Sequence, residues 1–317
     1  MQYSKILIVS ILIAISLCSS KCCDETETAY LFSYFTGNSR DGLHLAYSYD
    51  AISWTAINGG KSILAPAIGR DSLMRDPSIA QGPDGHFHMV WTISWHDLGI
   101  GYASSDDLIS WSEQQFLPVM DRFPSSKNVW APELFYNNDD QKFYIVWAST
   151  VPDLFPEIET TPNEKGLNHR LFYTTTTDFK SFAPTEIFFD PGFSCIDGAF
   201  FRFDGKIFMV VKNEMSIPAE KNLRLTFGTD ITALSTEVSP NISGNVWAEG
   251  PAPIVVGDTI IIYFDKYRNH SYGAIASTDC RTWNDISERI NLPSGIRHGT
   301  IFAVDKSVVE KLKMKFQ

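Results

Sequence analysis

Short apolar segments separated by polar turns run through most of this chain of 317 residues. Eight of these segments form four pairs, and the turns between partners contain Gly, Asn or Asp, which are typical of tight hairpin turns. The pattern predicts four β-hairpins, within residues 78–92, 134–148, 199–211 and 254–264. Only the tail, residues 307–317, is expected to form a helix.

A motif recurs five times along the chain: a strand is followed by Ser or Thr, then Asp, three residues and a large apolar side chain. The copies end at Trp54, Trp111, Phe182, Leu234 and Trp283, 49 to 71 residues apart. Long repeats made only of strands are typical of a β-propeller. We expect each Asp to close a turn with its side chain, and each apolar residue to pack between blades.

The two ends of the repeat region are predicted to pair with each other. The last apolar segment, residues 300–304, has no following partner, whereas the first, residues 30–35, has no preceding one. Pairing them would close the ring and remove the free sheet edges. The sequence therefore predicts an all-β fold, in which residues 25–317 form a single five-bladed propeller closed by its N- and C-terminal strands.

Residues 1–24 have the pattern of a secretory leader. Lys5 precedes an apolar run over residues 6–17, which is too short to span a membrane, and the small residues Ser19 and Ser20 follow. Cleavage after Ser20 is one alternative and lipidation at Cys18 is another, although Leu17 stands where lipidation sites usually have a small residue. We expect an exported protein, whether periplasmic, secreted or on the outer surface.

Composition restricts the possible partners. The formal net charge is −11, which disfavours binding to nucleic acid or to an anionic membrane and is compatible with a neutral substrate. Only Cys195 and Cys280 lie outside the leader region, so neither a disulfide framework nor a zinc site is indicated. Nothing in the sequence indicates a protein partner.

Acidic residues precede the first strands of several predicted blades. Because the innermost strands of a propeller run in one direction around the axis, equivalent positions meet at one end of the channel. Like charges held this close raise the pKa of at least one carboxyl group, and an acid and a base with separate pKa values are what glycosidic cleavage requires. The five positions aligned in this way are Asp76, Ala131, Asp197, Glu249 and His298.

A single carboxylate of this kind has an alternative, structural interpretation. Glu249 lies between Trp247 and a Gly-Pro pair, where it could simply cap a turn. Other acidic residues are predicted at the same end of the channel as Glu249, and this convergence favours a functional site.

These segments resemble glycoside hydrolase family 43, whose members are five-bladed propellers that act with inversion on polysaccharides containing arabinose, xylose or galactose. The resemblance extends from about residue 30 to residue 304. It implies that Asp76 in Arg-Asp-Pro-Ser-Ile is the general base and Glu249 in Ala-Glu-Gly-Pro the general acid. Asp197 in Ile-Asp-Gly-Ala-Phe would tune the acid and orient the substrate, although Gly198 stands where many members have proline.

The resemblance also implies a role for His298 in Arg-His-Gly, which in many members faces a calcium ion held through water. No cofactor is expected to be required, but a structural calcium in the central channel is possible.

Four further residues are candidates for substrate contact. Trp130 and Trp247 could stack on a sugar face or pack between blades. Glu133 could bind a sugar hydroxyl or pair with an arginine, and Arg297 could hold a carboxylate in place.

The function predicted from the sequence is hydrolysis of a neutral oligo- or polysaccharide by an exo-acting α-L-arabinofuranosidase. β-Xylosidase or galactosidase activity and a non-catalytic carbohydrate-binding propeller are the alternatives. A retaining fructosidase is a further alternative, because Arg75-Asp76-Pro77 resembles a motif of that group. Against it, no Asn-Asp-Pro motif precedes Asp76, and Glu249 is followed by Gly instead of Cys.

Overall fold

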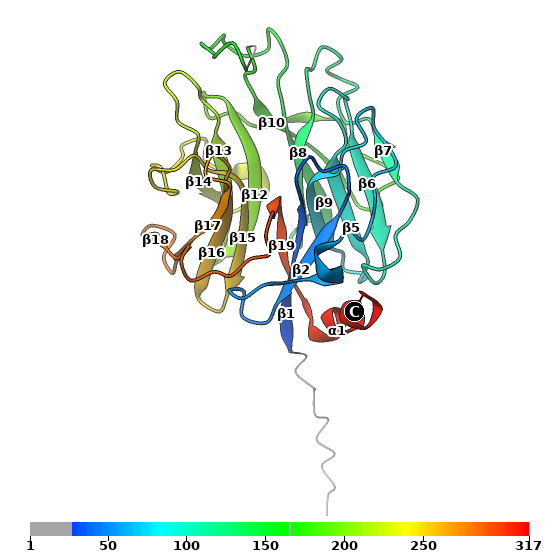
Figure 1. Ribbon diagram of the computed structural model, residues 1–317. Coiled ribbons are helices and arrows are strands. Elements are labelled where there is room, and N and C mark those ends of the chain that lie inside the picture. Colours follow the sequence, from blue (N-terminus) through cyan, green and yellow to red (C-terminus); the bar gives the residue numbers. More distant parts are fainter. Residues whose placement is uncertain (1–26, 165, 317) are drawn as a thin grey trace, which may run out of the picture.

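The computed structural model describes residues 27–164 and 166–316 of the chain. Within these residues, five β-sheets surround a common centre, and a single α-helix follows the last strand (Figure 1). The predicted leader, residues 1–24, lies outside the described residues. No helix within them is long and apolar enough to cross a membrane.

The sheets follow one another along the chain, and each runs from the centre of the ring outward. The first contains β4 (Arg75–Gln81), β5 (Phe87–Thr92), β6 (Ile100–Ser105) and β7 (Gln115–Leu117). The second contains β8 (Trp130–Asn137), β9 (Lys142–Ser149), β10 (Arg170–Thr176) and β11 (Glu186–Phe189). The third contains β12 (Cys195–Phe203), β13 (Lys206–Asn213) and β14 (Asn222–Gly228). The fourth contains β15 (Glu249–Val256), β16 (Thr259–Lys266), β17 (Ser271–Ser277) and β18 (Asn284–Asp285).

The fifth sheet joins the two ends of the described chain, as predicted. Its order is β19 (Arg297–Asp305), β1 (Thr28–Phe35), β2 (His44–Ser48) and β3 (Thr55–Ala56). β1 and β19 are antiparallel, with Phe32 opposite Ile301, and they lie side by side in Figure 1. Because β19 contacts both β15 and β4, this pairing closes the ring of innermost strands.

The helix α1 (Lys306–Phe316) confirms the helix expected at the tail. Its first turn is capped by Asp305, whose side chain accepts a hydrogen bond from the Ser307 amide at 2.7 Å. Val309 and Leu312 are buried in the same core cluster as residues of β1, β2 and β5, so the helix covers the apolar end of two sheets. Two short 3₁₀ helices, η1 (Ile57–Gly60) and η2 (Ile231–Ala233), complete the regular structure of the described residues.

The recurring Asp forms a side-chain turn in every copy of the motif. Each carboxylate accepts a hydrogen bond from the amide of the residue two positions later, at 2.7–2.9 Å: Asp50, Asp107, Asp178, Asp230 and Asp279. The prediction for the closing residue holds for Trp54, which is buried and donates to the hydroxyl of Tyr263 in the neighbouring sheet. It is wrong for Phe182, which is exposed.

Each innermost strand carries a bulge near its start. In all five sheets the register with the neighbouring strand shifts by one residue at this point. The residue inside the bulge has a positive φ in four of the strands: 52° for Asp76, 47° for Ala131, 56° for Asp197 and 58° for Gly250. A bulge of this kind changes the direction of one side chain at a sheet end, which is where propeller channels open.

The bulges correct one part of the predicted alignment. The equivalent positions are Asp76, Ala131, Asp197, Gly250 and His298, so Gly250 and not Glu249 occupies the bulge of β15. Glu249 is one residue earlier, at the level of Arg75 and Arg297. The sequence alignment matched acidic side chains, whereas the backbone places a glycine at the position with positive φ, where Gly is the least strained residue.

Candidate active site

A cavity of about 160 Å³ lies where the innermost strands begin. Asp76, Asp197, Glu249 and His298 all line it, although Glu249 reaches it from one position before the bulge. Each of the four comes from a different innermost strand. The structure thus brings the predicted acidic residues and the histidine to one small cavity, and their chemical roles stay predictions.

Asp76 is held as a carboxylate at the wall formed by β4. Its Oδ2 accepts a hydrogen bond from Thr92 Oγ1 at 3.0 Å, and its Oδ1 lies 3.3 Å from Nδ1 of His298. Burial alone would raise the pKa of Asp76, but the hydrogen bond and charge of His298, together with Arg75 and Thr92, lower it. Asp76 is therefore ionised at neutral pH, as a general base must be.

Asp197 has the opposite electrostatic environment. Burial raises the pKa of its carboxyl group to about 6; His298 and Lys212 oppose this shift, and Glu249 adds to it. Its Oδ2 accepts a hydrogen bond from the backbone amide of Gly250 at 2.9 Å. The middle carboxyl group is thus fixed to the strand that carries Glu249.

Both carboxylate oxygens of Glu249 have cationic partners. Oε2 lies 3.1 Å from Lys212 Nζ, and Oε1 lies 3.0 Å from Arg297 Nη2. Arg297 also forms an ion pair with Asp265 on β16 through its Nε. Arg297 therefore holds a carboxylate in place, and it is not among the residues that line the small cavity.

His298 is a cation in this arrangement. Burial opposes its protonation, yet Asp197, Asp76 and Glu133 raise its pKa to about 9. Among the described residues no three His, Cys, Asp or Glu side chains are grouped so that they could hold a metal ion. The calcium that the resemblance implies near His298 is held through water, and it stays a prediction.

Of the predicted substrate-contacting tryptophans, one lies at the cavity. Trp130 lines it, and its Nε1 donates to the carbonyl of Trp95 at 3.2 Å, with the two rings meeting edge to face at 5.9 Å. Trp247 is not among the lining residues, and the guanidinium of Arg268 lies 3.5 Å from its ring centroid. Trp130 and the half-exposed Trp95 therefore form the aromatic wall of the cavity.

Glu133 is further along the channel and is not among the lining residues of the cavity. Its Oε2 accepts a hydrogen bond from Thr300 Oγ1 at 3.1 Å, so Thr300 takes the place of the arginine considered as a partner. Burial raises the pKa of Glu133 to about 7, against the effect of Ser78, His298 and Thr300.

Two charged residues at the site were not predicted from the sequence. Lys212 and Glu214 line the cavity, and their side chains form an ion pair of 2.7 Å. The available signal was that Lys212 directly follows the apolar strand segment 207–211, so a charged residue interrupts a buried strand.

Residues 152–170 form an insertion between β9 and the start of β10. It does not contribute to the lining of the small cavity as far as the described residues show. Glu164 of the insertion nevertheless contacts the site indirectly, through Lys221 and Glu214.

Residues 25–310 match the model of a family related to glycoside hydrolase family 43, described as a probable glycosyl hydrolase domain. The chain belongs to this GH43-related family. The family assignment agrees with the five-bladed propeller and with the resemblance found in the acidic motifs.

Individual relatives of this GH43-related chain differ in their named activities. An α-L-arabinofuranosidase from Bifidobacterium longum subsp. longum is 25% identical, with 60% of this chain and 23% of the relative covered. The chain thus spans about a quarter of the length of that relative.

Two solved structures show the same fold at low sequence identity. An α-L-arabinofuranosidase from Lactobacillus brevis has a TM-score of 0.54 and 16% identity, covering 68% of this chain and 72% of that one. An exo-β-1,3-galactanase from Clostridium thermocellum has a TM-score of 0.57 and 12% identity, covering 86% of this chain and 62% of that one. At these identities the comparison shows a shared fold and does not identify the sugar on which the GH43-related chain acts.

Proposed function

We propose that this chain is an exported glycoside hydrolase that cleaves a terminal α-L-arabinofuranosyl residue with inversion. In this proposal Asp76 is the general base, Glu249 is the general acid, and Asp197 orients the substrate and tunes the acid. The observation that carries the proposal is the placement of Asp76 and Glu249 on one small cavity.

The positions of the two strands support a single-displacement reaction. Asp76 is on β4 and Glu249 is on β15, and β19 lies between these strands in the ring. Two carboxyl groups on strands that are not neighbours can reach opposite faces of a sugar ring. Glu249 would protonate the leaving oxygen, while Asp76 would remove a proton from the water that attacks the anomeric carbon.

Asp197 is suited to an orienting role by its fixed position. The Gly250 amide and the burial of its carboxyl group hold it beside the strand of the acid. A pKa of about 6 means that part of the Asp197 population is protonated at mildly acidic pH, where it can donate a hydrogen bond to the substrate.

The size of the cavity supports action on a terminal residue. A volume of about 160 Å³ is well below the roughly 300–1,000 Å³ of pockets for drug-sized ligands, so it suits one sugar unit better than a chain. Trp130 at the wall offers an aromatic surface to the apolar face of that sugar.

The choice of arabinose rests on the arabinofuranosidase relative, and xylosidase or galactosidase activity is the alternative within the family. Export rests on the leader pattern in residues 1–24. The reaction needs no cofactor, because acid and base are both protein side chains, and the partner is a neutral oligo- or polysaccharide.

The test is hydrolysis of nitrophenyl glycosides by the chain without residues 1–24. The panel holds α-L-arabinofuranoside, β-D-xyloside, β-D-galactoside and β-D-fructofuranoside, each measured beside Glu249→Ala and beside Glu288→Ala, whose side chain is exposed and serves as the control. We expect turnover of the arabinofuranoside that is reduced in Glu249→Ala, although less than on a natural arabinoside with a poorer leaving group, and kept in Glu288→Ala.

Proton NMR of the first product then reports the anomer. Release of the inverted anomer agrees with single displacement, and release of the retained anomer overturns it. Turnover of the xyloside or galactoside alone would mean that the substrate is xylose or galactose instead of arabinose. Turnover of the fructoside would mean that the proposed reaction class is wrong. Sugar binding with no turnover of these glycosides or of a polysaccharide digest would favour the non-catalytic propeller.

A further inference from the structure

Two lysines are buried behind Glu249. The side chains of Lys212, on β13, and Lys221, just before β14, are 2% and 3% exposed. A buried ammonium group is costly unless it is paired, so each of these lysines must have anionic partners. Their partners are what connect them to the active site.

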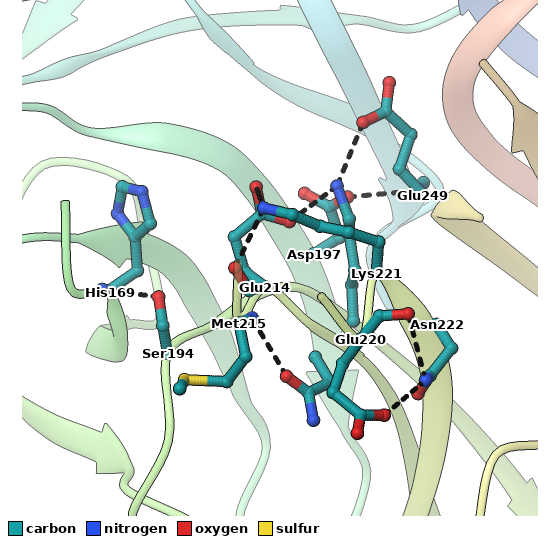
Figure 2. A network of polar contacts seen from close by, with 12 residues as sticks. His169, Ser194, Asp197, Glu214, Met215, Glu220, Lys221, Asn222 and Glu249 are labelled. Carbon is teal, nitrogen blue, oxygen red and sulfur yellow. Dashed lines mark hydrogen bonds and ion pairs between the residues drawn. The ribbon is translucent and has the colours of Figure 1, made fainter. Parts of the chain in front are cut away.

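The partners form a chain of alternating charges, of which Figure 2 labels Glu249, Glu214 and Lys221. Lys212 Nζ lies 3.1 Å from Glu249 Oε2 and 2.7 Å from Glu214 Oε2. Lys221 Nζ lies 2.8 Å from Glu214 Oε1 and 2.7 Å from Glu164 Oε1. From Glu249 to Glu164, each charge is thus adjacent to one of the opposite sign.

Lys212 and Glu214 stabilise each other in their ionic forms. Burial lowers the pKa of Lys212, but Glu214, Glu249 and Asp197 raise it overall well above its usual value. Burial raises the pKa of Glu214, but Lys212 and Lys221 lower it overall. Both groups are therefore charged at the pH at which a hydrolase of this kind would work.

Lys212 and Arg297 together fix the orientation of the Glu249 carboxyl group. It contacts Oε2 of Glu249, whereas Arg297 contacts Oε1, so the two cations fix both oxygens of the carboxyl group. A general acid must present one oxygen to the leaving group, and a displacement of about 1 Å costs roughly 100-fold in rate. The orientation of Glu249 therefore depends on where Lys212 is held.

The far end of the charge chain lies in the insertion at residues 152–170. Glu164 accepts a hydrogen bond from Thr161 within this segment, at 3.2 Å, and binds Lys221. Lys221 is also fixed by the backbone carbonyl of Glu214, at 2.9 Å. The insertion is thus connected to the acid through three intermediate charges.

We propose that Lys212 is a positioning residue for Glu249 and that Glu214 and Lys221 hold Lys212 in place. Glu164 couples the insertion to this chain of alternating charges, which we call the ion relay. The inference rests on the proposed role of Glu249 as the general acid. It goes beyond that role, because it assigns the orientation of the acid to a buried ion relay that begins in a surface insertion.

The first test compares Lys212→Met with Lys212→Arg. We expect kcat to fall about 10- to 100-fold in Lys212→Met with KM changed less than about threefold, because misorientation acts on the transition state. Lys212→Arg keeps the charge and should recover part of kcat. A rise in KM with kcat unchanged, or the same loss in both variants, would overturn the proposal.

The pH profile separates positioning from a general loss of packing. Removal of the buried cation beside the proposed acid should move the basic limb of kcat/KM to higher pH, whereas a general loss of packing should lower kcat/KM without moving this limb. An unmoved basic limb speaks against the relay. The titratable or charged groups that face Glu249 besides Lys212 are Asp197 on β12, Asp265 on β16, Tyr267 after β16, Tyr272 on β17 and Arg297 on β19.

The second test addresses the insertion. Glu164→Gln removes the last charge of the relay, and we expect a three- to tenfold loss of kcat. Lys142→Met is the control, because Lys142 is half exposed and lies 3.9 Å from a surface carboxylate. Equal losses in these two variants would contradict the coupling of the insertion to the acid.

A crystal structure of Lys212→Met tests the inference without any activity. We expect the Glu249 carboxyl group to turn away from its present position, and an unchanged side chain would overturn the proposal. If Lys212→Met does not fold, Glu214→Gln serves in the same measurements, since it removes the ionic partner of Lys212 and keeps the shape. An inactive wild-type chain would instead refute the proposed function, so the two failures are distinguishable.

Discussion

The backbone amide of Gly250 donates a hydrogen bond to Oδ2 of Asp197 at 2.9 Å. This contact joins the bulges of two neighbouring innermost strands, β12 and β15. It requires that the chain directly after Glu249 turn with a φ of 58°, a conformation that side chains other than glycine rarely adopt. The position of the acid thus depends on the glycine that follows it.

Gly250→Ala should therefore disturb the site. A Cβ at this position would lie 2.4 Å from Cγ of His298, so the histidine or the bulge must move. We expect kcat/KM to fall by at least about tenfold, and the unfolding free energy to decrease by more than about 1 kcal/mol. Both are measured on the purified variant, by glycoside hydrolysis and by urea denaturation.

Gly257→Ala is the matched control. Gly257 has a similar φ of 62°, but no heavy atom lies within 4 Å of the position of its Cβ. It shares the backbone strain and lacks the clash, so activity should be kept. Equal loss of activity in both variants would show that strain alone, and not the contact with His298, explains the effect.

The proposed acid and base should differ in their dependence on the leaving group. Glu249→Gln cannot donate a proton, so its kcat should fall about 10²- to 10⁴-fold on a natural arabinoside and much less on a nitrophenyl glycoside with a low leaving-group pKa. Asp76→Asn should lose activity on both substrates alike. If both variants show the same leaving-group dependence, the assignment of Glu249 as the acid and Asp76 as the base is wrong.

The fold could be predicted from the sequence because its signals are local and repeated. Hairpin turns, the recurring Asp and the unpaired end segments each follow from residues close together in the chain, and the structure shows the five sheets and the pairing of β1 with β19. The bulge at Gly250 was missed because register is a property of two paired strands. An alignment of single segments cannot show that Glu249 precedes the equivalent position by one residue.

The relay around Lys212 was missed for a different reason. Its members lie at sequence positions 164, 212, 214, 221 and 249, so the packing of three consecutive sheets brings Glu164 and Glu249 to the residues beside β13 and β14. A lysine at the end of an apolar strand indicates a buried charge, but the sequence does not say which carboxylate neutralises it. Contacts between blades are long-range, and the repeat pattern carries no information about them.

Removal of divalent metal ions should leave the activity intact. The described residues offer no grouped set of direct ligands, and the acid and base of the proposed reaction are both protein side chains. We expect the chain to keep its kcat/KM after dialysis against EDTA and to gain nothing on addition of calcium. A loss restored by calcium alone would instead support an ion held through water near His298.

Glu133 should make the stability of the chain depend on pH. Its pKa is about 7 in the folded chain against an ordinary value of 4.5, so the folded state binds the proton more tightly than the unfolded state does. The stability from this group is complete below about pH 4.5 and is lost as the pH rises through 7. Glu133→Gln keeps an acceptor for Thr300 and removes this titration.

The unfolding free energy of wild type should accordingly fall by about 3 kcal/mol more than that of Glu133→Gln between pH 4.5 and pH 8. Urea denaturation at a series of pH values measures the difference, with Glu288→Gln as an exposed control that should follow wild type. If Glu133→Gln instead loses more stability than wild type as the pH rises, the Glu133 carboxylate is stabilised in its ionised form. That result would contradict the raised pKa of Glu133.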